Sequence, residues 1–295
     1  MRLVILAFAL CAAGCFIDPN RLNDMTGGGD ATVYGDGSSG DLGDASVNAD
    51  NGSVVVEKTG SVVVAQFQTT ATVGTSATPL HVVSAAFYDT ISTPCALTTT
   101  GACTVQKCAN SAPVSNNNAG IITVTGGAPG TSTLTPSGDT YAPVMMNTLY
   151  WTAPVTLSVT AAGGDVPAFS TSVSAPPLIT VTSPAPPNQD MLGPPMSILK
   201  SSDLALAWTG GAAGSDVEFT LTSLPGDYLV RCKYAAANGS GTVPSAILTE
   251  AFDAGATTVR LSATSIGSSN IMAGDFKIGF LAINTASYGV TIDIE

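Results

Sequence analysis

The sequence predicts an all-β protein in which two antiparallel β-sandwich domains follow a disordered acidic linker. Its 295 residues include 37 Thr and 26 Val but only four Glu, four Gln and five Lys. β-Branched residues therefore abound, while the residues that suit an exposed helix face are scarce. From about residue 54 onward, short runs of alternating apolar and polar residues recur between clusters of Gly, Pro, Asn and Ser, which is typical of strands joined by turns.

The negative net charge of the chain argues against some classes of binding partner. Asp and Glu total 21, Lys and Arg total 9, and the formal net charge is −12. Nine scattered basic residues cannot build the positive patch that neutralises phosphates, so we expect no nucleic-acid partner. No Gly-rich run opens a helix in the manner of a phosphate-binding loop, and the sequence predicts no cofactor.

The first fourteen residues have the pattern of a signal peptide. Arg2 supplies a minimal positive region, and residues 3–13 form a continuous apolar run. This run is too short to span a bilayer core about 30 Å thick, which needs roughly 20 residues, but it suits the apolar region of a signal peptide. We therefore expect residues 1–14 to be removed when the chain is exported.

The end of this run, AAGC at residues 12–15, resembles the lipobox of bacterial lipoproteins. The resemblance implies that the Cys15 thiol receives a diacylglycerol, that cleavage occurs before it and that its new amino group is acylated. Two or more acyl chains anchor a protein stably, so the membrane becomes a partner. Phe16 follows instead of Asp, which in that family favours the outer membrane. Ala12 stands where Leu is usual; ordinary cleavage, with Cys15 a plain residue like Cys11, is the alternative.

Residues 15–53 are predicted to be a disordered linker. They contain seven Asp and one Arg among many Gly, Ser and Asn, and they show no apolar periodicity. Such a segment cannot bury enough surface to offset its ordering entropy, and a chain of about 38 residues has an r.m.s. reach of roughly 31–37 Å. A calcium loop that starts at Asp44 is the alternative. It lacks the turn glycine, where Ala49 stands, and the bidentate Glu, where Val55 stands, so we expect no metal.

Two stretches of alternating residues follow, at 54–182 and 197–295, and we expect each to form one sandwich. In the second stretch Leu204, Leu206 and Trp208 share a strand face. Period-two alternation places one face of a strand on a core and the other in water. Between the stretches, residues 183–196 are rich in Pro, which fixes φ, and they are expected to form an extended joint.

The C-terminal stretch resembles immunoglobulin-like and fibronectin type III modules. The features that carry the resemblance are the lead-in SPAPPNQDMLGPP, Trp208 early on a core strand, and about seven strands at regular spacing. Cys232 is the only cysteine of this stretch, so the antibody-type pair is absent, and a short helical turn is expected at residues 244–252. The chain as a whole is similar to secreted lipoproteins of Gram-negative bacteria with tandem sandwich domains, which implies a location more than an activity.

Four cysteines besides Cys15 remain in the expected mature chain: Cys95, Cys103, Cys108 and Cys232. Export places them in an oxidising compartment, and the crowding of the first three predicts at least one local disulfide, although four cysteines allow three pairings. Cys103 and Cys108 face opposite ways on a strand, so we expect Cys95 to pair with Cys103 or Cys108. Cys232 lies on an apolar strand face and is expected to be a buried thiol.

The sequence contains no recognisable catalytic constellation. His81 is the only histidine, so any Ser-His-Asp or Cys-His mechanism must use it, and no nucleophile-elbow pattern lies near it. We expect a structural histidine. Most acids, including Asp139 and Asp165, stand in expected turns. Tyr150 and Trp151 adjoin on an expected strand, so one should face the core and the other should be exposed or lie at an interface, which is a thin basis for a sugar-binding platform.

The sequence therefore predicts a non-enzymatic, lipid-anchored cell-envelope protein whose sandwich domains serve binding or structural roles at the outer membrane or cell surface. A glycan-binding module is the alternative. A carboxylate-dependent enzyme that acts on envelope polysaccharide is a third reading, and it needs two carboxyl groups about 5–10 Å apart in a cleft.

Overall fold

The computed structural model describes residues 56–67, 79–91, 96–107, 113–152, 154–185, 196–212, 214–223, 229–253, 255 and 257–295. The predicted signal peptide (1–14) and linker (15–53) lie outside these residues. Within them the chain is all-β, as the sequence predicts. The helical segments described are α2 (Ser245–Asp253), close to the expected turn, and the 3-10 helix η3 (Ala236–Asn238).

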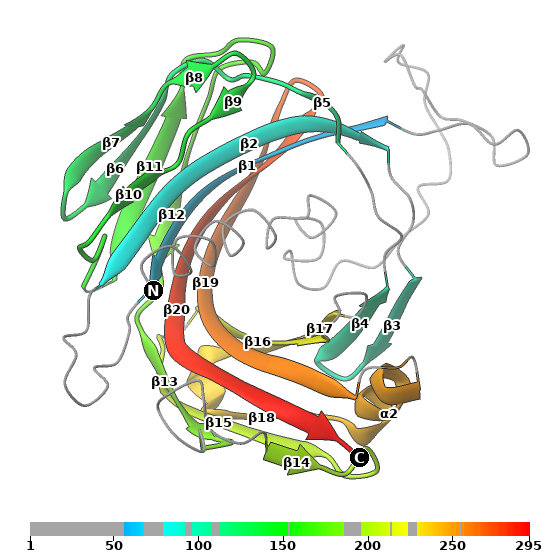
Figure 1. Ribbon diagram of the computed structural model, residues 1–295. Helices are drawn as coiled ribbons and strands as arrows, with labels where there is room; N and C mark the ends of the chain where they lie inside the picture. Colours follow the sequence, from blue (N-terminus) through cyan, green and yellow to red (C-terminus); the bar gives the residue numbers. More distant parts are fainter. Residues whose placement is uncertain are drawn as a thin grey trace, which may run out of the picture.

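The largest element is a strongly curved sheet of eleven strands (Figure 1). Its order is β10 (Val144–Met146), β2 (Leu80–Ile91), β1 (Val56–Phe67), β20 (Phe276–Ile294), β19 (Thr258–Ala273), β16 (Asp216–Ser223), β17 (Leu229–Ala235), β4 (Cys103–Lys107) and β3 (Ala96–Thr100), with β5 (Pro113–Asn116) beside β2 and β14 (Met196–Ile198) beside β20. Described pairs are antiparallel, as predicted, except that β1 and β14 run parallel to β20.

Smaller sheets lie on the outer side of this curve (Figure 1). One has four strands: β12 (Phe169–Ala175), β11 (Val155–Ala161), β6 (Ile122–Gly127) and β7 (Gly130–Leu134). Another has three: β13 (Ile179–Ser183), β15 (Leu204–Gly210) and β18 (Ser240–Val243). A short pair joins β8 (Pro136–Ser137) to β9 (Thr140–Tyr141).

The four-stranded sheet packs on β2, β1 and β20 and encloses what we term the upper core. Val62, Val64 and Phe280 point outward from the large sheet and meet Val124 and Leu157 of the outer sheet. All five side chains have no exposed surface. Each outer strand alternates buried and exposed residues, as in β12, so the two layers form a sandwich.

The three-stranded sheet and α2 pack on β16, β17, β19 and β20 and enclose the lower core. Leu206 and Trp208 of β15, which the alternation assigns to one face, meet Phe219 and Leu261 of the large sheet and Ile247 of α2. All five are at most 2% exposed. The period-two pattern of these strands thus predicts their buried faces correctly.

The two cores do not follow the predicted domain boundaries at 54–182 and 197–295. The long strands β19 and β20 line both, with Phe276 in the upper core and Ile292 in the lower. β1 and β4, from the first stretch, pair with β20 and β17, from the second. Period-two alternation identifies the buried face of a strand, but it does not identify the strand that pairs with it. The sequence alone therefore predicts two separate domains, divided at the Pro-rich joint.

The long strands change register between the two cores. The pairing of β19 with β20 shifts at residues 262–264, which face residues 285–289. Extra residues on one strand interrupt an antiparallel ladder and bend it. Leu261 on one side of the shift faces the lower core, and Ile271 on the other side packs on the upper core. The irregularity therefore lies where the sheet passes from one core to the other.

The outer four-stranded sheet approaches the large sheet closely at Gly267 of β19. A Cβ atom there would collide with the backbone oxygen of Ser174 in β12. A backbone atom cannot rotate away as a side chain can, so this contact requires glycine.

We expect Gly267→Ala to lower the free energy of unfolding by about 1–3 kcal/mol, because the added methyl forces β12 away from β19. Denaturant unfolding followed by tryptophan fluorescence measures the change. Ser268→Ala, at the next residue of the same strand, is the control and should stay near wild type. Equal stability of both variants would contradict the close approach.

Candidate functional site

His81 is buried within the upper core region. Its side chain has no exposed surface, its Nδ1 donates a hydrogen bond to the backbone oxygen of Thr148 at 2.7 Å, and its ring meets Tyr150 edge-on with centroids 4.9 Å apart. A carbonyl oxygen only accepts, so Nδ1 carries the proton. A ring without access to solvent cannot exchange a proton with a substrate, and His81 has the environment of a structural histidine.

Four buried polar side chains lie in one row across four neighbouring strands. Gln66 of β1 stands opposite His81 of β2 on one side and Asn284 of β20 on the other. Asn284 in turn stands opposite Ser265 of β19. Each is at most 1% exposed. We call these four residues the polar row.

Gln66 binds a loop through both ends of its amide. Its Oε1 accepts the backbone N–H groups of Tyr150 and Trp151 at 3.0 and 3.1 Å, and its Nε2 donates to the Trp151 oxygen at 3.1 Å. These three bonds satisfy backbone groups that would otherwise be buried without partners. The sequence alone does not predict this role, since a single Gln in an apolar run is the only signal for it.

The polar row also holds the segment that links the two outer sheets. Ser265 Oγ donates to the Pro177 oxygen at 2.7 Å, and Trp151 Nε1 donates to the Pro176 oxygen at 2.8 Å. Pro176 and Pro177 lie between β12 and β13, where the chain leaves the four-stranded sheet for the three-stranded one. Ser265 of the polar row and Trp151, which Gln66 holds, together fix the crossing between the two cores.

Tyr150 and Trp151 correct one expectation. They lie outside the strands and are 0% and 3% exposed, so neither faces solvent. Gln66 fixes the backbone of this pair so that both rings enter the upper core, which alternation on a strand would forbid. Neither ring can stack on a sugar at the surface.

Charged residues on β16 and β17 face the inner side of the curve and pair with one another. Arg231 Nε and Nη2 donate to the two carboxylate oxygens of Glu218 at 2.9 and 2.6 Å, and both side chains are largely buried. Lys233 lies 2.9 Å from Asp216. Three of the four border a shallow depression, which Ile266 and a serine complete. The opposite charges offset each other, so this recess has no net charge to attract an ion.

A second cluster of polar residues, separate from the polar row, connects the turns at one end of the four-stranded sheet. Asn118 Nδ2 donates to the carboxylates of Asp139 and Asp165 at 3.4 and 2.9 Å. The Tyr141 hydroxyl accepts from and donates to the backbone of residues 119–120, and burial raises the pKa of this phenol. Both aspartates lie in turns, as predicted, and both are exposed. Here they bind the loops to one another.

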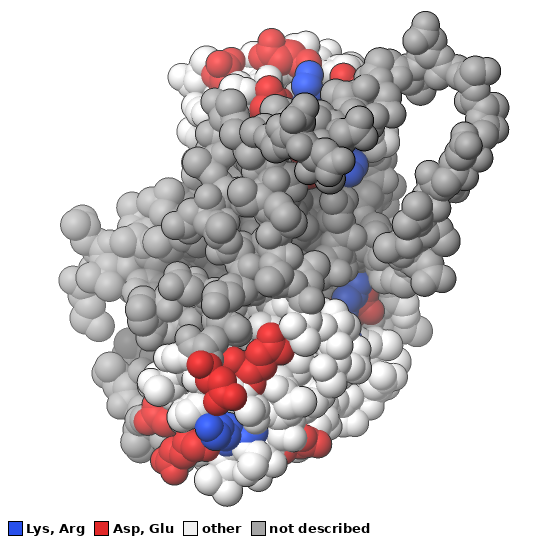
Figure 2. Space-filling model, turned by 90° about the vertical axis from the view of Figure 1, so that its right-hand side faces the viewer, with Lys and Arg blue, Asp and Glu red and all other residues white. Residues whose placement is uncertain are grey.

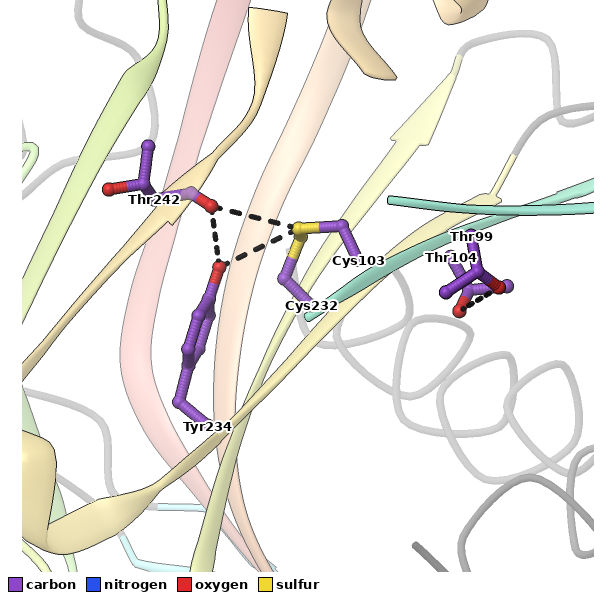
Figure 3. The surroundings of a disulfide bond; sticks show 6 residues. All are labelled: Thr99, Cys103, Thr104, Cys232, Tyr234 and Thr242. Carbon is purple, nitrogen blue, oxygen red and sulfur yellow. Dashed lines mark hydrogen bonds between the residues drawn. A yellow bond between two sulfur atoms is a disulfide. The ribbon is translucent and has the colours of Figure 1, made fainter. Parts of the chain in front are cut away.

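Cys103 and Cys232 form a disulfide that joins β4 to β17 (Figure 3). They stand directly opposite each other on the two strands, and both have no exposed surface. The Tyr234 hydroxyl donates to the Thr242 oxygen at 2.8 Å and lies 3.6 Å from the Cys103 sulfur. Burial raises the pKa of Tyr234, so it stays a neutral donor at physiological pH. The bond links the edge hairpin β3–β4 to the lower core.

This disulfide corrects the expected state of Cys232, which is bonded rather than a free thiol. Cys103 was a predicted disulfide residue, but its partner lies 129 residues away and not at Cys95. The sequence favoured a local partner because it does not reveal that β4 pairs with β17. Cys15, Cys95 and Cys108 lie outside the described residues.

Among the described residues, no cluster of three or more His, Cys, Asp or Glu is suited to a metal ion. None of the helices formed by these residues is long and apolar enough to cross a membrane.

Comparisons with protein-family models, with curated proteins and with solved structures found no match for this chain.

We expect Gln66→Ala to lower the free energy of unfolding by on the order of 3 kcal/mol. The substitution leaves three buried backbone groups of Tyr150 and Trp151 without partners, and each such group costs about 1–3 kcal/mol. Chemical denaturation measures the loss, with the exposed Ser172→Ala as control. A variant within about 0.5 kcal/mol of wild type, the usual range for neutral surface changes, would show that the amide does not hold the loop.

Proposed function

We propose that the chain is a non-enzymatic cell-envelope protein that a lipid on Cys15 anchors at the outer membrane or cell surface. The main support for this proposal is the apolar run that ends in AAGC at residues 12–15, where the sequence changes abruptly from apolar to polar. The β structure would then stand clear of the membrane surface and serve binding or structural roles.

The number of residues between Cys15 and the first described strand supports this arrangement. The first described strand begins at Val56, about 40 residues after Cys15. The flexible linker that the sequence predicts for residues 15–53 would reach roughly 31–37 Å, which is comparable to the thickness of a bilayer. A domain on such a stalk meets partners in solution without pressing on the lipid.

The surface and the buried groups of the described residues also support a display role. Figure 2 looks from the open side of the curve and shows more acidic than basic side chains on the visible surface, which disfavours anionic partners. His81 is committed to a buried hydrogen bond, and Glu218 is committed to Arg231. These groups support packing, and on that ground we propose a protein without catalytic activity.

Incorporation of radiolabelled fatty acid tests the anchor. In a bacterial host that acylates lipoproteins, the wild-type chain should carry the label, and Cys15→Ala should lose it because the thiol that accepts the lipid is gone. Cys11→Ala is the matched control, since Cys11 lies within the part that cleavage removes, and it should keep the label. Label that persists in Cys15→Ala would contradict the proposal.

Glycan binding is a second candidate, favoured by the outer face of the four-stranded sheet. The outward-facing side chains of its strands are hydroxyls: Thr123, Thr125, Thr131, Thr133, Thr156, Ser158, Thr160, Ser170, Ser172 and Ser174. In one row Ser170, Thr160, Thr123 and Thr133 stand opposite one another on successive strands. Neighbouring strands lie about 4.8 Å apart, so the face offers uncharged donors and acceptors at regular spacing.

A panel of neutral polysaccharides tests this second candidate. We expect the wild-type chain to bind at least one of them and Thr160→Arg to lose that binding at least tenfold, because a long charged side chain then covers the middle of the face. Thr209→Arg, on the exposed face of the three-stranded sheet, is the control and should bind normally. Silence of the wild type on the whole panel would remove this candidate.

A further inference from the structure

The hairpin β3–β4 lies at one end of the large sheet, while its neighbours in the sequence lie at the other end (Figure 1). β2 precedes the hairpin, β5 follows it, and these two strands pair with each other. Within the sheet, the strands β1, β20, β19, β16 and β17 separate β2 from β4. The hairpin therefore connects the two ends of the curve.

The two ends of the curved sheet consequently lie close together. Four residues separate Ile91 at the end of β2 from Ala96 at the start of β3. A fully extended chain advances at most about 3.6 Å per residue, so the Cα atoms of Ile91 and Ala96 lie within roughly 18 Å of each other. The hairpin spans the open side of the curve between these ends. We call this hairpin, residues 96–107, the clasp.

Few of the described groups besides the disulfide hold the clasp on the sheet. Of its side chains that the structure describes, Cys103 and Val105 enter the lower core, where both are at most 1% exposed. The Thr98 hydroxyl donates to Glu250 of α2 at 2.9 Å, but this bond is exposed, and water competes for both groups. β4 pairs with β17 over four residues. A two-stranded hairpin is marginally stable in water by itself, so the bond to Cys232 is the main attachment among these contacts.

The strand edge that the clasp covers is one that needs a cover. Val230 and Cys232 of β17 face the lower core, and the backbone of residues 229–232 pairs with the clasp. An uncovered edge strand offers unpaired N–H and C=O groups to other chains, which favours aggregation. Docking of the clasp therefore completes both this edge of the sheet and the lower core.

We propose that the Cys103–Cys232 disulfide is a redox lock, and that the clasp stays docked on β17 only when this bond is formed. On formation, the two thiols give two electrons and two protons to the disulfide of an exchange protein in the cell envelope, which leaves as a dithiol. This inference rests on the proposed function, because export brings the chain to that oxidant. Both cysteines have no exposed surface, so a reductant reaches the closed bond only after this edge of the sheet opens.

Hydrogen–deuterium exchange of the exported chain tests the lock. The double substitution Cys103→Ala with Cys232→Ala removes the bond and keeps small apolar side chains at both positions. The Lys233 amide is the reporter, because it donates to the Ala102 oxygen of the clasp at 3.0 Å. We expect this amide to exchange at least tenfold faster in the variant, while the amides of β11 in the upper core stay within twofold of wild type.

Two results of this experiment would overturn the inference. A Lys233 amide that stays within twofold of wild type would show that the clasp remains docked without the bond. Equal acceleration in β11 would show that the bond supports the whole fold instead of the clasp. If the variant does not fold, wild type that has been reduced in denaturant and refolded without oxidant takes its place, and the same two results apply.

Val259→Ala is the matched control. Val259 is buried in the lower core on β19, and β16 lies between that strand and β17, so the substitution weakens this core and leaves the bond intact. We expect exchange in β16 and β19 to rise at least as much as exchange at the Lys233 amide. A selective rise at Lys233 in this variant would contradict the lock, since the clasp would then open with the bond in place.

Alkylation of free thiols in the exported chain, with the alkylated residues located by mass spectrometry, separates this inference from the proposed function. Wild type that carries the fatty-acid label should have Cys103 and Cys232 joined. If both are alkylated in a labelled chain, the lock fails and the anchor stands. If they are joined in a chain without lipid, the anchor on Cys15 fails and the lock stands.

Discussion

The passage of β19 and β20 through both cores is the constraint on which the rest of the structure depends. Side chains of one β20 strand close the upper core at Phe280 and the lower core at Ile292. β1 joins one edge of this strand pair and β16 joins the other. Both outer sheets pack on this strand pair as well as on its neighbours, so the two sandwiches are parts of one structure.

The polar row resolves the problem that this arrangement creates. Where a sheet passes from one core to another, the chain segments that connect the outer sheets must also cross, and their backbone groups become buried. Ser265 supplies a hydrogen bond to such a segment at Pro177, and Gln66 supplies three to the nearby loop at residues 150–151, both from within the large sheet. A wholly apolar strand pair at this position would leave the crossing segments without partners, which is costly in a buried setting.

The local features of the fold could be predicted from the sequence, and the long-range ones could not. Alternation identifies the buried faces of Leu206 and Phe219, because side-chain direction is a property of each strand alone. The parallel pairing of β1 with β20 joins residues more than 200 positions apart, and no local pattern encodes it. The predicted domain boundaries are wrong for the same reason. A Pro-rich segment indicates a joint in the chain, but it does not indicate which strands pair on either side of it.

The candidate site residues divide in the same way. The environment of His81 agrees with the expectation from its isolation in the sequence, and the turn positions of Asp139 and Asp165 follow from residue type. Predicting the partner of Cys103 would have required knowing that β17 lies beside β4. Predicting the role of Gln66 would have required knowing that the loop with Tyr150 lies against it. In each missed case the determining contact comes from a distant part of the chain.

The position of β20 in the chain has a consequence for biogenesis. β20 is C-terminal to every other described strand, yet it lies near the middle of the large sheet, between β1 and β19. Synthesis is vectorial, so the residues of β1 and β2 emerge long before the strand that completes their layer. The layer that β1 and β2 begin therefore stays incomplete until β20 has been synthesised.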